Sequence, residues 1–348
     1  MKELAITAVN SITAVGHDGR MTAAAVRAGI SRFMEYQEFP DRDGNPITVA
    51  RINGIEDVDQ YDPAARMADI AGFCLKNLLN EYFMDTTRRC SQINLFMGVP
   101  TVKRPGKRFE ENFKDPLKMI LDKWTNKVEI EVIPQGNASM HFAVNEVSKR
   151  IECCPTAICI IGGIDSLLMQ SSLKWFDQAG RLKSDSDGCH QGLIAGEAVG
   201  FIIIEDAAQA RKENRPVLAR ITGLGLSVEP DTRATNSPSR NSGLTNACHA
   251  AMTGVKDNDI RALFSDLNGE ELRSKEWGMA DMRCFKERHE DRKMWHPANC
   301  YGDIGAASGT LLANIVTQGF VRNWLQTPVL IFCSDDHGPC GALVLEKE

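Results

Sequence analysis

The residues with the clearest chemical potential lie between Gln135 and Glu146, where a glycine-containing turn leads into a periodic helix. The helix is expected to continue to Ile151 and to be followed by an apolar strand, Ala157 to Ile161. The first turn of a helix carries free N–H groups and the positive end of the helix dipole, which favour anions and thiolates. A nucleophile is therefore expected where the helix starts. The residue there is Asn137, whose carboxamide cannot form a covalent acyl intermediate.

Two interpretations of Asn137 follow from its position. Asparagine is among the best helix N-caps, because its side-chain oxygen accepts a bond from an N–H two or three residues on, worth about 1 kcal/mol. We favour this interpretation, with a polar ligand contact as the second. Ser139, in the first turn, is a weak alternative nucleophile. A serine needs a neighbouring base, and His141 projects about 200° away from it around the helix.

Other histidines and cysteines give weaker signals. Four residues have a spacing that a zinc site could use: Cys284, His289, His296 and Cys300. No C-x-x-C knuckle accompanies them. The pair Cys189-His190 lies in a loop, and neighbours in sequence rarely face each other. We therefore predict neither a metal nor a cofactor.

Two polar segments could contact a ligand. The turn Asp335-Asp336-His337 could bind a polar group, and turn-forming aspartates explain it as well. The segment from Lys103 to Lys118 is rich in Lys and Arg and could hold an anion. Basic runs are usually solvated, so we expect a surface helix and loop there.

The composition indicates a soluble globular protein. The chain has 348 residues, of which 25% are charged and 43% hydrophobic, enough for two domains or one large duplicated core. The net charge of −6 argues against nucleic acid as a partner. No apolar run is long enough to span a membrane, and the N-terminus has no signal-peptide pattern. The eleven scattered cysteines fit reduced thiols, so a cytoplasmic location is expected.

Helices and short apolar strands alternate along the chain. Helices are expected at 21–28 and 63–82, and a surface excursion and a polar linker at 36–62 and 207–216. Strands are expected at Leu4–Val9, Ile93–Val99, Val128–Ile133, Ala262–Ser265 and Val329–Ser334.

The second part of the chain repeats the pattern of the first. The segment starting at Leu218 matches that at Leu4, the segment at Val329 matches that at Ile158, and Gly341–Glu346 matches Gly200–Glu205. Three matched strands in the same order indicate an internal duplication. We predict an N-terminal half at 1–206 and a C-terminal half at 217–348, forming one compact duplicated domain of α/β class.

At this point the chain resembles the β-ketoacyl synthases of the thiolase fold. The resemblance rests on the duplicated halves and on three glycine-containing runs, Gly188 to Gly200, Gly302 to Gly309 and Gly338 to Leu345. It implies a five-layered α-β-α-β-α fold with two pseudo-twofold-related halves. It also implies a homodimer that pairs through the strand before the Asn137 turn. Glu197 matches a structural position and should be paired or hydrogen-bonded, since an isolated buried carboxylate is costly.

The family's chemistry uses a cysteine and two histidines, which accept an acyl group from acyl-carrier protein or CoA and decarboxylate a malonyl thioester. The matching positions here hold Asn137, Asn268 and Asp303. All three family residues are therefore missing, and the chain is shorter than a typical synthase. Met140 and His337 are expected to line the same site, and a pocket closed by Met140, Asn268 or His337 would leave no room for an acyl chain.

Two classes of function follow from this comparison. The first is a non-condensing binding or scaffold protein, either a non-catalytic partner of a true synthase or an accessory protein of a bacterial type VI secretion effector cluster. The alternative is an acyltransferase of the 3-oxoacyl-acyl-carrier-protein synthase type that uses an atypical site. We favour the binding or scaffold protein, and we assign no residue a catalytic role.

Overall fold

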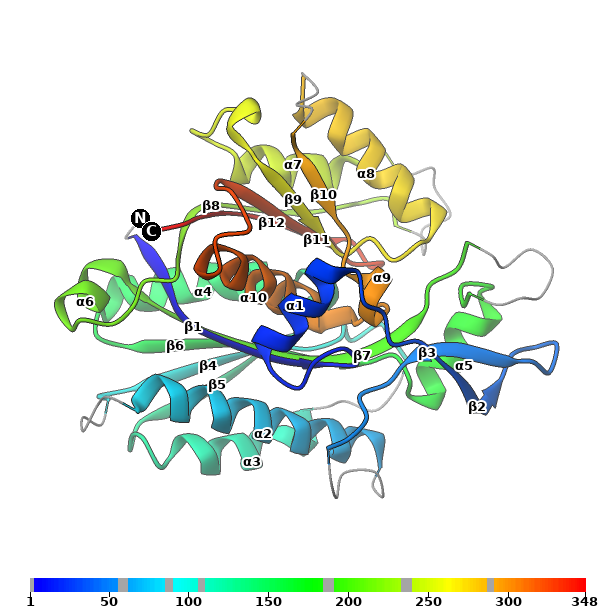
Figure 1. Ribbon diagram of the computed structural model, residues 1–348, viewed down its shortest axis with the longest axis horizontal. Coiled ribbons are helices and arrows are strands. Elements are labelled where there is room, and N and C mark those ends of the chain that lie inside the picture. The colour runs from blue at the N-terminus through cyan, green and yellow to red at the C-terminus, as the bar shows by residue number, and fades with distance from the viewer. Residues whose placement is uncertain are drawn as a thin grey trace.

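Two sets of five strands form the frame of the molecule (Figure 1). The computed structural model describes residues 3–55, 62–84, 90–105, 110–183, 191–232, 240–286 and 291–348. The first set runs in the order β1 (Leu4–Thr13), β7 (Ala195–Asp206), β6 (Ile158–Ser166), β4 (Ile93–Gly98) and β5 (Val128–Ile133). The second runs in the order β8 (Ala219–Val228), β12 (Pro339–Glu346), β11 (Val329–Ser334), β9 (Ala262–Ser265) and β10 (Lys293–Trp295).

Both sets have the same internal topology. Numbered from its own first strand, each set has the order 1-5-4-2-3, and the strands of corresponding number have the same parallel or antiparallel pairing. A short antiparallel ladder between β1 and β8 joins the sets, with Leu4 opposite Ile221. The division at 206 and 217 stays a prediction, and each set of strands falls within one of the proposed halves.

Helices form three layers around the two sets of strands (Figure 1). The outer layers are α2 (Pro63–Phe83) with α3 (Glu110–Leu121), and α7 (Ser242–Ala251) with α8 (Glu271–Cys284). The middle layer holds α4 (Ser139–Cys153) and α10 (Ser308–Val321), which contact strands of both sets. Every residue of α10 from Ser308 to Phe320 is buried, as expected of a helix enclosed on all sides. The predicted five-layered α-β-α-β-α arrangement is confirmed.

The remaining elements lie at the margins of these layers. Helix α1 (Gly19–Ala28) packs on α10. The short helices are α5 (Gln170–Gln178), α6 (Ala207–Lys212) and α9 (Ala298–Tyr301). Helix α6 occupies the segment predicted as a linker, and Asp206 caps it by accepting a bond from Gln209 N at 2.9 Å. None of the described helices is both long and apolar enough to cross a membrane.

The surface excursion predicted at 36–62 is partly wrong. Strands β2 (Met34–Pro40) and β3 (Pro46–Ala50) form a hairpin there, and β3 pairs with β7 next to Ala195. The turn residues between the strands hid the short alternating apolar pattern, in which Ile47 and Val49 are buried. Residues 56–61 of that segment lie outside the described part of the chain.

Glu197 has the structural role expected of it. Its side chain is 2% exposed, and Oε1 accepts bonds from Arg66 Nη1 at 2.8 Å and from Ile52 N at 2.9 Å. Its second oxygen, Oε2, accepts the hydroxyl of Ser166 at 2.9 Å. This buried carboxylate is therefore both paired and hydrogen-bonded.

Candidate functional site

Two short 3₁₀ turns lead into the central helices, and both begin with a glycine in the left-handed region. The turn η1 (Gly136–Ala138) starts at φ 55°, and η4 (Gly305–Ala307) starts at φ 49°. In η1 the N–H of Asn137 donates to Asp335 Oδ2 at 3.4 Å. In η4 the N–H of Ala306, which occupies the corresponding position, donates to Asp165 Oδ2 at 2.8 Å. Each aspartate comes from the opposite half, so each half places a carboxylate at the positive end of the other's central helix.

The side chain of Asn137 does not cap α4, and the N-cap prediction is wrong. Residues 136–138 already form a 3₁₀ turn that continues into α4, so Asn137 lacks the extended backbone of an N-cap. Its amide Nδ2 donates instead to Oδ2 of Asp266 at 3.0 Å, just beyond β9. Asn137 is 6% exposed, and its side chain serves as a donor within a buried polar network.

The fold brings together Asn268 and Asp303, the other two positions that the resemblance predicts to match histidines. Asn268 Nδ2 donates to Asp303 Oδ2 at 2.7 Å and to Glu270 Oε2 at 2.9 Å. The second oxygen of Asp303 accepts the N–H of Gly305 at 2.9 Å. Both Asn268 and Asp303 are about nine-tenths buried, and burial raises the pKa of the Asp303 carboxyl. These two side chains therefore satisfy each other and the neighbouring turn.

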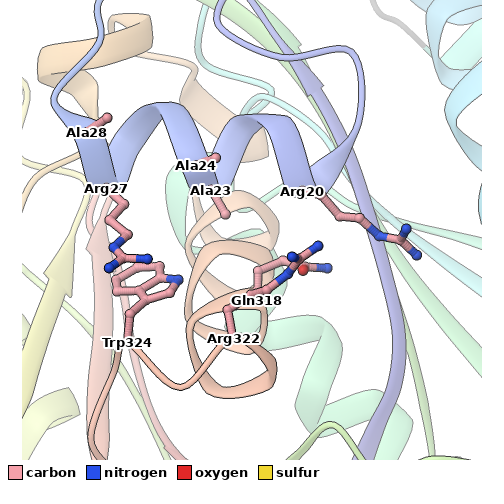
Figure 2. A pocket seen from close by; sticks show the side chains of 8 residues that line it. All are labelled: Arg20, Ala23, Ala24, Arg27, Ala28, Gln318, Arg322 and Trp324. Atoms are coloured by element: carbon pink, nitrogen blue, oxygen red, sulfur yellow. The ribbon is translucent and has the colours of Figure 1, made fainter.

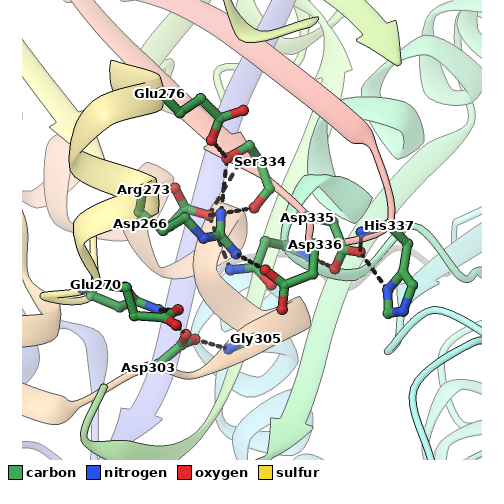
Figure 3. A network of polar contacts seen from close by, with 12 residues as sticks. Asp266, Glu270, Arg273, Glu276, Asp303, Gly305, Ser334, Asp335, Asp336 and His337 are labelled. Atoms are coloured by element: carbon green, nitrogen blue, oxygen red, sulfur yellow. Dashed lines mark hydrogen bonds and ion pairs between the residues drawn. The ribbon is translucent and has the colours of Figure 1, made fainter. Parts of the chain in front are cut away.

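Two arginines that sequence analysis did not single out hold this acidic cluster together, and Figure 3 shows one of them, Arg273, among the carboxylates. Arg181 binds both carboxylate oxygens of Glu270 at 2.8 Å and also pairs with Asp336 at 2.6 Å. Arg273 donates to the Ser334 hydroxyl at 2.8 Å and lies 3.4 Å from Asp266 Oδ2. Both guanidinium groups are more than nine-tenths buried. Buried carboxylates are stable in such a place only when they are paired in this way.

A third arginine corrects the prediction for the basic segment. Arg104 was expected among solvated residues, but its side chain is 12% exposed and forms a two-point ion pair with Asp165. One of these bonds, from Nη1 to Oδ2, measures 2.8 Å. The same oxygen, Asp165 Oδ2, accepts the N–H of Ala306 in η4. Arg104 therefore anchors the carboxylate that anchors the start of α10.

Ser139 and Met140 occupy structural positions. The Ser139 hydroxyl is fully buried and donates to the carbonyl of Ile133 at 2.9 Å, and its oxygen accepts the N–H of Gln135 at 3.2 Å. Met140 is fully buried and packs against α10 at Gly309. Burial lowers the pKa of His141 to about 4. Among the described contacts of Ser139 there is no bond to a base.

The space in front of Asn137 is nearly filled. A cavity of about 20 Å³ remains there, enough for about one water molecule. His337 forms part of its wall, with Nδ1 2.9 Å from the Thr101 hydroxyl and 3.1 Å from Asp335 Oδ1. The described wall consists of Thr101, Arg104, Asn137, Leu167, Trp175, Phe176, Arg273, Asp303, Gly305, Asp335, Asp336 and His337. Met140 and Asn268 are not among them.

The weaker histidine and cysteine candidates find no support in the described residues. No group of three or more His, Cys, Asp or Glu side chains there could hold a metal ion. Of the four zinc candidates, His289 lies outside the described residues, as do Cys189 and His190. Cys340, at the start of β12, is buried and donates to the Gly338 carbonyl at 3.3 Å.

Asp266 makes the stability of the site depend on pH. Burial raises its pKa to about 7, while Arg273 and the Asn137 amide oppose that rise. In the unfolded chain an aspartate has a pKa of about 3.9, so the native state binds the proton more tightly between about pH 4 and 7. The stabilisation that Asp266 contributes therefore falls as the pH rises through this range.

We expect the free energy of unfolding of the wild-type protein, relative to that of Asp266→Asn, to be higher at pH 5 than at pH 8. Urea denaturation of both proteins at the two pH values measures this difference. The asparagine variant does not titrate, so it serves as the reference. A difference that stays constant with pH would contradict the prediction.

Solved structures place this arrangement in a known fold. The chain matches a ketosynthase from module 6 of the bacillaene synthase of Bacillus subtilis 168 with a TM-score of 0.80, over 99% of this chain and 72% of that one, at 12% identity. The ishigamide ketosynthase/chain length factor matches at 0.77, over 100% and 99% of the two chains, at 16% identity. The fold is that of the ketosynthases. A β-ketoacyl synthase from Burkholderia phymatum STM815 matches at 0.76 over 100% of both chains, at 15% identity.

Comparison of the sequence with known proteins gives no match, in contrast to the comparison of structures. No family model matches the chain, and no curated protein matches it. The structural matches establish the fold, but at identities this low they do not establish the chemistry. The chemistry has to be argued from the residues of the site.

Proposed function

We propose that this protein uses the ketosynthase fold as a binding or scaffold protein and has no condensing activity. The observation that carries the proposal is the filled site in front of Asn137. A condensing enzyme needs a thiolate at this helix start and room for an acyl chain. Here an asparagine amide is bonded to Asp266, and the remaining cavity has about the volume of one water molecule.

The electrostatics of the site support the same proposal. Condensation and decarboxylation develop negative charge on a thioester oxygen, which needs positioned donors. At the two positions that match the family's histidines, Asn268 donates to the carboxylates of Asp303 and Glu270. Asp266 lies beside Asn137. Carboxylates so placed would repel the developing charge, and the side-chain amides of Asn137 and Asn268 already donate to them.

The proposed assembly uses the outer edge of β5. This strand pairs with β4 on one side and ends the sheet order among the described strands. Its residues Val128, Ile130 and Val132 are half-buried and alternate with the exposed Glu129 and Glu131. An open strand edge is a natural site for pairing with a second strand. We infer a dimer through β5, and a stable monomer in light scattering would contradict it.

The partner across β5 is a second copy or a true synthase. One of the similar structures is described as a ketosynthase/chain length factor, and another as an acyl-carrier protein in complex with its ketosynthase. These descriptions favour pairing with a synthase and contact with acyl-carrier protein, and a CoA thioester is the other ligand that we propose for such an assembly. An accessory role beside a type VI secretion effector is the other setting that a scaffold would serve. Both settings need a protein-binding surface and no acyl pocket.

Intact-mass measurement after incubation with acyl-CoA and acyl-carrier-protein donors tests the proposal. We expect no covalent adduct on the wild-type protein, while an active β-ketoacyl synthase treated in parallel gains one acyl group. Because the cavity is filled, Asn137→Cys is also expected to remain unmodified.

The Asn137→Cys variant distinguishes the effect of the filled cavity from the effect of the missing nucleophile. A stoichiometric adduct on the wild-type protein would overturn the scaffold proposal and support the acyltransferase alternative. An adduct on Asn137→Cys alone would show that an acyl chain can enter, which contradicts the filled site but not the loss of the nucleophile.

A further inference from the structure

A basic groove lies between α1 and the end of α10, away from the filled site. Its volume is about 460 Å³, within the range of small-molecule sites. Fourteen residues of α10 separate Ser308, next to η4, from Arg322 in the groove, which corresponds to about 20 Å along the helix axis. Three arginines line the groove, although the chain as a whole has a net charge of −6. Its ligand chemistry is therefore separate from that of the Asn137 site.

The face of α1 that lines the groove has a regular pattern. Arg20 and Arg27 are seven residues apart, which places them two turns and about 10 Å from each other on one helix face. Between them lie Ala23 and Ala24, whose methyl groups leave the space open (Figure 2). The helix therefore presents two positive groups at the ends of a shallow apolar floor.

Helix α10 supplies the opposite wall. Gln318 and Arg322 extend from its last turn toward α1, between the two arginines of that helix (Figure 2). Trp324 lies below Arg27, whose guanidinium carbon is 5.8 Å from the centre of the ring. This contact is within the range of a cation–π interaction and orients Arg27 over the groove.

The charges of the groove are incompletely neutralised. Arg20 pairs with Glu81, and both side chains are exposed. Among the described residues, neither Arg27 nor Arg322 forms an ion pair with a carboxylate, and both are exposed. Arginines at helix C-termini also complement the helix dipole, which accounts for Arg27 and Arg322 separately. Arg20 lies in the first turn of α1, where a positive charge is unfavourable, and its ion pair with Glu81 offsets this.

We propose that this groove binds a small ligand carrying two or more phosphate groups. Guanidinium groups bind phosphate oxygens through two parallel N–H bonds, which makes arginine suited to such ligands. Three arginines around one opening can contact several phosphate oxygens at once. The Gln318 amide adds a neutral donor, and the Trp324 ring holds Arg27 over the opening.

Isothermal titration calorimetry with the full chain tests this site, using sodium pyrophosphate and ADP as probes without added metal. We expect saturable binding of at least one probe, weakened by added salt because exposed charges are screened. A nucleoside that adds contacts beside those of the phosphates would make ADP the tighter ligand. Equal affinity would assign recognition to the phosphates alone, and both results support the site.

Two variants place the binding in the groove. Arg27→Gln combined with Arg322→Gln removes the two arginines without a carboxylate partner and should weaken binding at least tenfold. Ala24→Glu keeps a good helix former on an exposed position and puts a negative charge on the floor, so it should weaken binding similarly.

A matched control removes the same charge elsewhere. Lys123→Gln combined with Lys174→Gln changes two exposed lysines outside the groove and should alter affinity less than twofold. Absence of binding by both probes at millimolar concentration would overturn the proposal. Equal weakening by the lysine pair and the arginine pair would also overturn it, because it would assign binding to net charge.

Discussion

Replacing Gly305 by alanine is expected to lower the free energy of unfolding by about 3 to 5 kcal/mol. The residue has φ 49°, where an L-amino acid is strained by about 1 to 2 kcal/mol. An added Cβ would also lie 2.0 Å from Asp165 Oδ2 and 3.0 Å from Arg104 Nη1. The carboxylate would have to move, which disturbs its bond to the Ala306 N–H and its pair with Arg104.

The matched control for this change is Gly29→Ala. Gly29 has φ 68° at the end of α1, and a Cβ there would meet no atom within 4 Å. It carries the backbone strain alone, so we expect a cost of about 1 kcal/mol. Urea denaturation with an unchanged slope measures both values. Equal costs for the two variants would show that the contact with Asp165 is unimportant.

The surroundings of Gly305 show which features of the fold can be predicted from the sequence and which cannot. The helix after Asn137 and its flanking strands are predictable, because α4 has helical periodicity, β5 alternates apolar and acidic residues, and β6 is a short apolar run. The duplication is predictable from three matched strands. Neither pattern reveals that Asp165 reaches across to η4, because that contact joins residues 141 positions apart.

The candidate site was predictable only where the family pattern supplied positions. Asn268 and Asp303 do meet, as their matching positions imply. Arg181 and Arg273 could not be identified in advance, because each is a single arginine with no local motif and its partners come from distant segments. Sequence spacing describes one helix face or one strand, whereas ion-pair networks depend on how several elements pack.

The N-cap error at Asn137 has the same origin. Local rules assign asparagine before a helix to a cap, because its side chain can accept a nearby N–H. In the structure a carboxylate from a distant segment, Asp335, accepts the N–H of Asn137, while the side chain turns to Asp266. A tertiary contact thus replaces the local one.

The buried pair of Arg104 and Asp165 gives the second large effect. We expect Arg104→Met to lower the free energy of unfolding by about 3 to 5 kcal/mol, because it leaves the fully buried Asp165 without its cation. The Ala306 N–H would remain as a donor to that carboxylate, which is insufficient for a buried charge. Urea denaturation at pH 7 measures the loss.

A surface pair supplies the control. Arg42 lies 4.0 Å from Asp177, and its side chain is 51% exposed, so Arg42→Met should cost less than about 1 kcal/mol. The comparison uses the same substitution at a buried and an exposed arginine. Similar costs at both positions would contradict a role for burial.

The double variant Arg104→Met with Asp165→Asn separates charge from packing. An asparagine at 165 keeps an oxygen for the Ala306 N–H and removes the charge that Arg104 neutralises. We therefore expect the double variant to be more stable than Arg104→Met alone, a sign of strong coupling. Costs that simply add would show that the pair acts through shape. Coupling would instead show that the charges of Arg104 and Asp165 stabilise each other, and with them the bond to Asp165 that holds the start of α10.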